Sequence, residues 1–401
     1  MAKRPAKPRE TGKPERRAHP DSAEPARAVA PYPPPIPLAS VLGQDRALET
    51  LRAAMRSQRI HHAWIFHGPA GVGKFTTALA FAADLLDPTT APSLSGELAA
   101  DPDSPVQRLI AAGSHPDLHV ITKELARFSK NPQVRERKLL TIPKDVIDEH
   151  LLRPAALGPS LRSASRATKV FIVDEAEMLD ASPTNAPSQN AILKTLEEPP
   201  EGTVIILVTS SEEHLLPTIR SRSQRVPFVP LSDAAMRTWL KGAGLVLPQE
   251  EQDWLLEFCA GSPGALTLAH RGGMHAWHRK LSPLLDALDQ GKYPIELAPG
   301  MAQLIDEWAV RWVNEHENAS KELANRMGAE WMFRLLGEHW RGRLHRAARK
   351  GDGAGASRSA GVLDALRRCE TRLDANVGVT FALEAIVADA LALVTGEAIA
   401  T

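Results

Sequence analysis

The sequence predicts an α/β fold in which a parallel five-stranded sheet carries helices on both faces and is followed by an all-helical region. A glycine-rich phosphate-binding loop, Gly68 to Lys74, stands between a short apolar run and an Ala- and Leu-rich helical pattern. Further apolar runs alternate with helical patterns, which is typical of parallel sheets that are buried on both faces. After Pro230 the strand signals stop, and helical patterns continue toward Thr401.

The composition is that of a globular protein. The chain has 401 residues, which suggests two to four domains at roughly 100–200 residues each. Lys+Arg and Asp+Glu are both 48, so net charge gives no argument for free nucleic-acid binding. Only two cysteines occur, far apart, which excludes a disulfide framework and a Cys-rich zinc site. Without a long apolar run or a signal core, we expect a cytoplasmic protein.

The predicted elements follow in chain order. Residues 1–37 are rich in Pro, Ala, Lys and Arg and predict a disordered basic tail, because such a segment cannot bury enough apolar surface. Five apolar runs predict the strands: Ala63–Phe66, Leu118–Ile121, Val170–Val173, Val204–Val208 and Arg225–Phe228. Apolar spacing or composition predicts helices at Asp45–Met55, Thr76–Leu86, Pro143–Leu152 and Asn190–Leu196.

Changes in composition suggest the domain limits. Residues 38–230 hold all strand signals, residues 231–272 read as a small helical lid, and residues 273–401 read as a carboxy-terminal helical domain. Within the first domain, Asp87 to Gln107 is rich in Pro, Ser and Ala and predicts a surface excursion. In the last domain, a Gly/Ser-rich stretch from Gly351 to Ser359 predicts a break, and Val377 to Val394 predicts a closing helix.

The glycine loop predicts a nucleotide site with one altered part. Gly68, Gly71 and Gly73 let the backbone N–H groups point at phosphate oxygens, and Lys74 adds a positive charge. The next residue normally supplies a hydroxyl to magnesium, but here it is Phe75. Thr76 is turned by about 100° around the helix and should not simply replace that hydroxyl. Two interpretations stay open: a nucleotide site with impaired magnesium chemistry, or a loop kept for packing.

Polar residues follow two of the predicted strands. Asp174 and Glu175 come directly after Val170–Val173. In a phosphate-loop site the first acid holds magnesium and the second orients or activates water. Thr209, Ser210 and Ser211 end the next strand, where a hydroxyl could orient water or simply end the strand. These acids are candidates for cofactor binding because they follow a phosphate loop.

Two further groups lie outside the loop. Arg222 precedes the last strand, and an arginine on a rigid rim can stabilise charge on the γ-phosphate of a neighbouring subunit. Taken alone, it would be read as a surface arginine.

His61 and His62 precede the first strand, and we interpret them as local hydrogen-bonding groups, since no third metal ligand is near. The sequence offers no metal site.

With these residues in view, the chain resembles the bacterial DNA polymerase III clamp-loader subunits, which are AAA+ proteins. The likeness is strong from Leu38 to about Leu268 and weak in the carboxy-terminal helices. It rests on these segments: Val41–Gln44, His62–Trp64, Gly68–Lys74, His115–Asp117, Lys169–Glu175, Asn190–Pro200 and Arg220–Ser223. The run from Asn190 to Pro200 is highly characteristic of this group.

Two types of subunit in that family compete: the ATP-hydrolysing motor (gamma/tau) and the delta-prime stator. Phe75 favours the stator. So does Gly264, which stands where the motor carries an arginine in its second sensor segment. The cysteine zinc module of the motor is absent, and the length lacks the motor's long extension. Against this, the Asp174–Glu175 pair is better preserved than in many delta-primes. Ser223 replaces the third residue of the family's Ser-Arg-Cys motif, while its arginine is intact.

The resemblance implies a stator role. Arg222 would act in trans on the ATP of a neighbouring motor subunit, and the helical domain would join a collar with the motor and delta subunits. ATP with magnesium is the implied cofactor, without zinc, while hydrolysis by this chain alone is not expected. The sliding clamp and primed DNA would be met through the complex, at the nucleoid-associated replisome. The alternatives are an autonomous or motor-type AAA+ ATPase and, ranked lower, a recombination or repair helicase.

Overall fold

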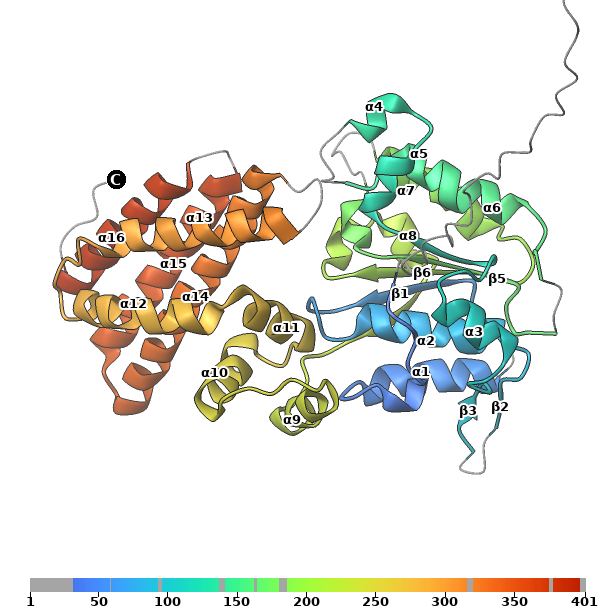
Figure 1. Ribbon diagram of the computed structural model, residues 1–401, viewed down its shortest axis with the longest axis horizontal. Helices are drawn as coiled ribbons and strands as arrows, with labels where there is room; N and C mark the ends of the chain where they lie inside the picture. Colours follow the sequence, from blue (N-terminus) through green and yellow to red (C-terminus); the bar gives the residue numbers. More distant parts are fainter. Residues whose placement is uncertain are drawn as a thin grey trace, which may run out of the picture.

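The computed structural model describes residues 32–57, 59–92, 96–136, 141–161, 164–179, 186–315, 320–374 and 378–396. The predicted tail over residues 1–31 lies outside these ranges. A part built on the sheet occupies one side of the molecule and a helical bundle the other, with three short helices beneath and between them (Figure 1). None of the described helices is both long enough and apolar enough to cross a membrane.

The sheet has five parallel strands, as predicted. Its spatial order is β4-β5-β6-β1-β7. The strand bounds are β1 Ala63–His67, β4 Leu118–Ile121, β5 Lys169–Val173, β6 Thr203–Thr209 and β7 Gln224–Pro227. Because all strands run the same way, the loops after β1, β5 and β6 meet at one edge. We call this the carboxyl edge, and the opposite one the amino edge.

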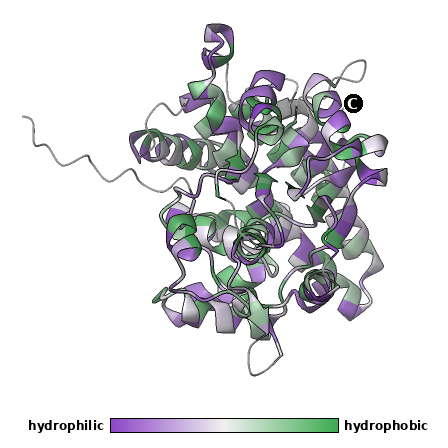
Figure 2. Ribbon diagram, turned by 90° about the vertical axis from the view of Figure 1, so that its right-hand side faces the viewer, coloured by the Kyte–Doolittle hydropathy of each residue, from purple (hydrophilic) through white to green (hydrophobic). Residues whose placement is uncertain are grey.

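Alternate strand residues supply two cores, one on each face of the sheet. Trp64 and Phe66 pack with the first helical layer, whereas Ile65 and Phe171 pack with the second. The first layer comprises η1 Leu38–Ser40, α1 Asp45–Arg56, α2 Lys74–Leu86 and α3 Pro105–Ala111. The second comprises η2 Lys123–Phe128, α4 Pro132–Arg135, α5 Lys144–Ile147, η3 Asp148–Leu152, α6 Arg153–Ala156, η4 Ala176–Met178, α7 Pro187–Glu197, η5 Glu212–His214 and α8 Pro217–Ser221. Hydrophobic and hydrophilic residues share the same helices around the sheet (Figure 2).

Parts of the sheet domain differ from the prediction. The surface excursion after Asp87 contains a small antiparallel pair, β2 Ala91–Pro92 with β3 Leu98–Ala99, and the helix α3. The predicted Pro143–Leu152 helix divides into α5 and a π-helical turn, η3. The predicted tail reached residue 37, but Tyr32 is only 7% exposed in the core. Its apolar ring therefore ties the end of the predicted tail to the folded domain.

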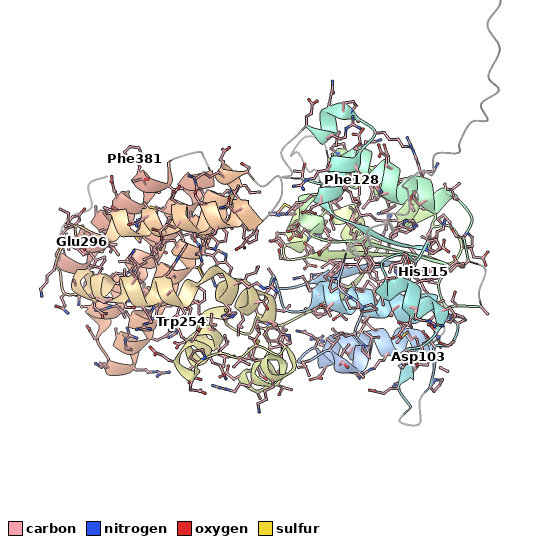
Figure 3. The ribbon with its side chains drawn as sticks, in the orientation of Figure 1. Asp103, His115, Phe128, Trp254, Glu296 and Phe381 are labelled. Carbon is pink, nitrogen blue, oxygen red and sulfur yellow. The ribbon has the colours of Figure 1, made fainter. Side chains whose placement is uncertain are left out.

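The segment His115–Asp117 is structural. The Asp117 carboxylate accepts the N–H groups of Ser160 and Leu161 at 2.8–3.0 Å, which fixes the chain ahead of β5. The Nδ1 of His115 in turn accepts the N–H of Asp117 at 3.2 Å. His115 lies in the sheet domain, far from Trp254 of α10 on the helical side (Figure 3).

Helices alone follow the sheet. They are α9 Asp233–Gly242, α10 Gln249–Cys259, α11 Pro263–Gly272, α12 Met274–Asp289, α13 Leu297–Glu315, α14 Lys321–Lys350, α15 Gly353–Asp374 and α16 Val379–Thr395. One apolar core runs from the α1–α2 layer through α9–α11 into this bundle.

The predicted break from Gly351 to Ser359 is wrong beyond its first two residues, because α15 begins at Gly353. The Asp352 carboxylate accepts the N–H of Gly355 at 2.8 Å and so starts that helix despite its glycines.

Candidate functional site

The phosphate-binding loop connects β1 to α2 at the carboxyl edge of the sheet. Lys74 is the first residue of α2 and is 6% exposed. Its Nζ donates to the carbonyl oxygens of Gly68 and Pro69 at 2.7 and 2.5 Å. Burial lowers the pKa of Lys74, while the carboxylates of Glu177 and Asp174 oppose that shift. The lysine is therefore held against the loop in an acidic setting.

A cavity of about 620 Å³ opens beside this loop. Six of the seven predicted cofactor-binding residues line it: Gly71, Gly73, Lys74, Thr76, Asp174 and Glu175. The seventh, Gly68, lies behind, where a Cβ would come within 2.2 Å of the Phe228 carbonyl oxygen. Apolar side chains such as Leu42 and Trp239 line other parts of the cavity. The site thus joins the phosphate loop to apolar walls, and its volume lies in the range of small-molecule sites.

The same residues fit magnesium less well. Phe75 lines the cavity and packs against the core, and it offers no oxygen. Asp174 remains as an acidic ligand, but burial raises its pKa to about 6. With a pKa of about 6 this carboxyl is still mostly ionised at pH 7, so Asp174 stays available as a cation ligand and the deficit lies at Phe75. The loop could hold phosphate oxygens, while the magnesium site lacks one of its two usual protein ligands.

The carboxylate of Glu175, which lines the cavity, is engaged in an ion pair. Its backbone has a φ of 49°, in the left-handed region. Its carboxylate forms an ion pair with Nζ of Lys123 at 2.7 Å, and Lys123 is not among the residues that line the cavity. A glutamate that activates water must be free to accept a proton. Here the carboxylate is instead engaged by Lys123, although Glu175 still lines the cavity.

Glu177 belongs to the site and was missed from the sequence. Its Oε1 accepts hydrogen bonds from the hydroxyl of Ser210 and, at 3.2 Å, from the N–H of the same residue. Burial raises the pKa of Glu177, but these bonds outweigh burial and the pKa is lowered overall. The charged carboxylate of Glu177 therefore faces Lys74, and it binds the Ser210 hydroxyl that could orient water. The only sequence signal was its position two residues after Glu175.

The lid helix α11 begins in direct contact with the phosphate loop. The N–H of Gly264 donates to the Gly71 carbonyl oxygen at 2.9 Å, and Ser262 Oγ donates to the Ala70 carbonyl oxygen at 2.9 Å. A Cβ on Gly264 would lie 2.8 Å from the Cα of Gly71. Gly264 is thus required by the close approach of two backbones. An arginine at this position would force the helix away from the loop.

A second surface contains Arg222, at the end of α8. Its guanidinium forms an ion pair with Glu197 at 2.8 Å and donates to the Thr218 carbonyl oxygen at 3.0 Å. The two side chains of the ion pair are 38% and 50% exposed. His61, His62 and Leu196 line the same open pocket, of about 580 Å³. We call the pocket with these residues the arginine surface.

His61 makes the local bond predicted for it, whereas the bond of His62 reaches a residue distant in the sequence. His62 Nε2 lies 2.8 Å from the carbonyl oxygen of Leu196, and His61 Nδ1 lies 2.8 Å from that of Ala63. The bond to Leu196 ties the start of β1 to the end of α7. Glu197, the residue after Leu196, pairs with Arg222, so segments distant in the sequence meet around this arginine.

The arginine surface and the phosphate loop lie at opposite edges of the sheet. His62 precedes β1 and Arg222 precedes β7, whereas the loop follows β1 and Asp174 follows β5. The five residues of β1 at about 3.3 Å each separate the edges by about 16 Å. Arg222 is absent from the cavity that holds Lys74. It cannot act on a phosphate bound by its own loop.

The chain is similar to known subunits of DNA polymerase III. The family model described as DNA polymerase III, delta subunit, matches residues 43–232. The gamma/tau subunit of DNA polymerase III from Mycobacterium tuberculosis is 30% identical over 236 residues, which cover 57% of this chain and 36% of that protein. The delta' subunit from Pseudomonas aeruginosa is 32% identical over 214 residues, covering 53% and 57%. The delta' subunit from Bacillus subtilis is 28% identical over 195 residues, covering 48% and 50%.

This chain therefore spans between about a third and just over half the length of these relatives. Motor-type and delta'-type subunits match at similar identity, so the distinction between them depends on the site residues. The match over residues 43–232 covers just under half of this chain and, with the phosphate loop on a five-stranded parallel sheet, makes the chain similar to DNA polymerase III clamp-loader subunits.

Proposed function

We propose that this chain is a delta-prime-type stator of a clamp loader. It assembles with motor and delta subunits and supplies Arg222 to the ATP site of an adjacent motor subunit. The assembled loader uses that ATP to place a sliding clamp on primed DNA. The observation that carries the proposal is the position of Arg222. Its side chain is 38% exposed and lies at the edge of the sheet opposite its own phosphate loop.

The ion pair with Glu197 suits a group that must act on a partner. Exposed ion pairs contribute roughly 0–1 kcal/mol, so Arg222 can exchange Glu197 for a phosphate at little cost. A guanidinium binds phosphate oxygens with two parallel hydrogen bonds and stabilises charge that develops in phosphoryl transfer. Such arginines contribute about 10³–10⁵ in rate, equivalent to about 4–7 kcal/mol of barrier.

The chain's own loop supports binding better than hydrolysis. Phe75 offers no magnesium ligand, and Gly264 leaves no arginine at the start of α11. Glu175 is paired with Lys123, and Glu177 occupies the Ser210 hydroxyl. Phe75 and Gly264 each leave out a group that hydrolysis uses in this type of site, whereas the two glutamate contacts hold groups that are present in other bonds. We propose that ATP, if bound here, is retained rather than turned over.

The experiment compares loaders assembled from motor and delta subunits with either the unchanged chain or Arg222→Ala. We expect normal assembly by size-exclusion chromatography and a loss of about 10³-fold in ATP turnover. Arg225→Ala is the matched control, because Arg225 is also an exposed arginine paired with a glutamate, Glu212, three residues along the chain. Full turnover with Arg222→Ala, or an equal loss with Arg225→Ala, would refute the role of Arg222.

The cavity also supports a second candidate, an ATPase of the motor type. Lys74, Asp174 and the loop glycines are retained around a volume that can hold a nucleotide. On this hypothesis the purified chain hydrolyses ATP, and Lys74→Ala abolishes that turnover. Steady turnover by the isolated chain would favour this candidate over the stator.

A further inference from the structure

A second large cavity lies in the helical bundle, about 610 Å³ in volume, between the ends of α12, α14 and α16 and the start of α15. Its walls are rich in cations. Arg343, Arg346 and Lys350 project from one face of α14 at the spacing i, i+3, i+7, and Arg358 faces them from α15. The carboxylates that line the cavity belong to Asp289 and Asp352, so four cations meet two acids.

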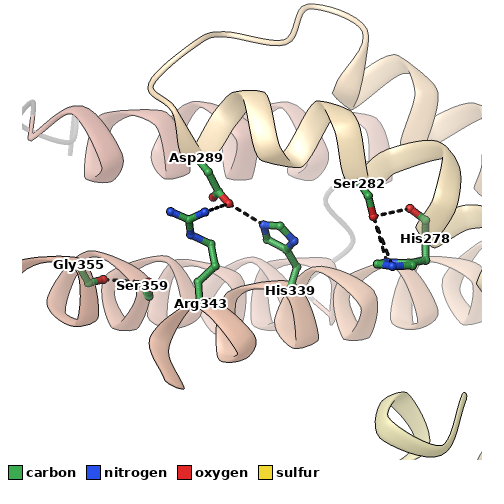
Figure 4. A network of polar contacts seen from close by, with 7 residues as sticks. All are labelled: His278, Ser282, Asp289, His339, Arg343, Gly355 and Ser359. Carbon is green, nitrogen blue, oxygen red and sulfur yellow. Dashed lines mark hydrogen bonds and ion pairs between the residues drawn. The ribbon is translucent and has the colours of Figure 1, made fainter. Parts of the chain in front are cut away.

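Internal contacts already occupy both acids and one of the cations. Asp289, whose side chain is 2% exposed, accepts hydrogen bonds from Arg343 and, at 3.1 Å, from His339 Nε2 (Figure 4). The Arg343 guanidinium also lies 5.8 Å from the centre of the Trp340 ring. Asp352 caps α15 through the N–H of Gly355. Arg343 is therefore committed to the bundle.

The other three cations have no acidic partner among the residues that the structure describes. Arg346, Lys350 and Arg358 are exposed, and each lines the cavity. Lys350 also ends α14, where a cation is favoured by the helix dipole, but that effect is confined to the last turn. It does not account for Arg346, one turn earlier, or for Arg358 on another helix. Three unpaired cations around one cavity attract a polyanion.

The remaining wall chemistry distinguishes between two polyanions. A bound acidic peptide would need apolar walls for its other side chains, yet the apolar wall is limited to small or partly buried groups such as Ala347 and Val394. Nucleic-acid phosphates need only cations and hydrogen-bond donors. Trp340 is 3% exposed and stacked under Arg343, so the pocket offers no aromatic platform for bases.

We propose that this cavity binds the phosphodiester backbone of DNA, without reading its sequence, through Arg346, Lys350 and Arg358. The choice of DNA rests on the proposed clamp-loader function, whereas the anionic class of the ligand rests on the cavity alone. The contact would give the helical bundle a direct hold on the DNA that the loader serves. A chain with no net charge would thus carry its DNA contact in a local patch.

The test uses the isolated full-length chain and a fluorescein-labelled primed DNA of arbitrary sequence, with binding followed by anisotropy across a series of salt concentrations. The triple variant Arg346→Ala/Lys350→Ala/Arg358→Ala should bind at least about tenfold more weakly. It should also reduce the salt slope by about 2–3, because each lost phosphate contact removes about 0.7–0.9. The three side chains are exposed, so the fold should be retained, and circular dichroism checks this.

The matched control is Lys241→Ala/Arg279→Ala/Lys280→Ala, which removes the same charge from exposed positions outside the cavity. Its affinity should stay within about twofold of the unchanged chain. Equal loss in both triple variants, or no DNA binding by the unchanged chain, would overturn the proposal. Binding of polyglutamate in preference to DNA would overturn it in favour of an acidic peptide. Since the assay measures no ATP turnover, it can fail while the Arg222 proposal stands, and the reverse also holds.

Discussion

The two edges of one parallel sheet differ in how their charged groups are held. At the carboxyl edge, Lys74 is buried among loop carbonyls and α11 packs directly on the loop. At the amino edge, Arg222 is partly exposed and is held by one surface ion pair and one bond to the Thr218 carbonyl oxygen. The first edge has the form of a nucleotide site with its reactive groups engaged elsewhere. The second has a reactive group and no site of its own. On the proposed function, the phosphate loop persists as a structural element while the catalytic contribution comes from the opposite edge.

Gly264→Ala tests whether the carboxyl edge is fastened to the lid. The new Cβ would lie 2.8 Å from the backbone of Gly71, so α11 must shift, and we expect a loss of about 2 kcal/mol in the free energy of unfolding. Urea denaturation measures it. Gly300→Ala in α13 is the control, because its Cβ would meet open space, and there we expect a gain of up to about 1 kcal/mol. Equal urea denaturation midpoints for Gly264→Ala and Gly300→Ala would show that α11 does not pack tightly against the phosphate loop.

Asp174→Asn tests the charge state of the same edge. The folded-state pKa of about 6 lies above the ordinary 3.8, so the wild-type chain loses stability as pH rises from about 4 to about 6. Asparagine removes that loss. The variant should be more stable by about 2 kcal/mol at pH 7.5 and unchanged below pH 4.

Chemical denaturation at both pH values measures this difference. Asp84, whose pKa burial also raises to about 6, gives the same decline in both proteins and so cancels from the comparison. A variant that is less stable than wild type at pH 7.5 would mean that a partner neutralises the Asp174 charge.

Glu197→Gln should have the smallest effect and tests the amino edge. The exposed pair contributes at most about 1 kcal/mol, so the free energy of unfolding should change by less than about 0.5 kcal/mol. In the assembled loader, Arg222 would lose its holding partner but keep its bond to Thr218. We expect ATP turnover to change by only a few fold. A loss as large as that of Arg222→Ala would mean that Glu197 itself takes part in the chemistry.

The sequence predicted most of the fold because its signals were local. The strand–loop–helix order around Gly68–Lys74 and the five apolar runs correspond to observed elements. The α15 start at Gly353 was missed, since glycines argue against a helix and the compensating cap comes from Asp352. The sequence predicted Tyr32 to lie in the disordered tail, because no local pattern in a proline-rich segment indicates that a distant core buries one of its side chains.

For the candidate site, the residues were predictable but their orientations were not. Six of the predicted cofactor-binding residues line one cavity, yet the pair between Glu175 and Lys123 depends on two segments that only the fold brings together. The contact of Gly264 with Gly71 also depends on segments that only the fold brings together. It shows that packing requires a glycine at this position, where the sequence comparison had noted only a missing arginine. The ion pair of Glu197 with Arg222 likewise brings together two motifs, Asn190–Pro200 and Arg220–Ser223, that lie apart in the sequence.

The central claim is that this chain contributes to catalysis from the amino edge and not from its own loop. The most direct test measures ATP turnover by one assembled loader in two versions, with either Lys74→Ala or Arg222→Ala in this subunit. We predict turnover within about twofold of the unchanged loader for Lys74→Ala and a loss of about 10³-fold for Arg222→Ala. A large loss with Lys74→Ala and none with Arg222→Ala would contradict the account.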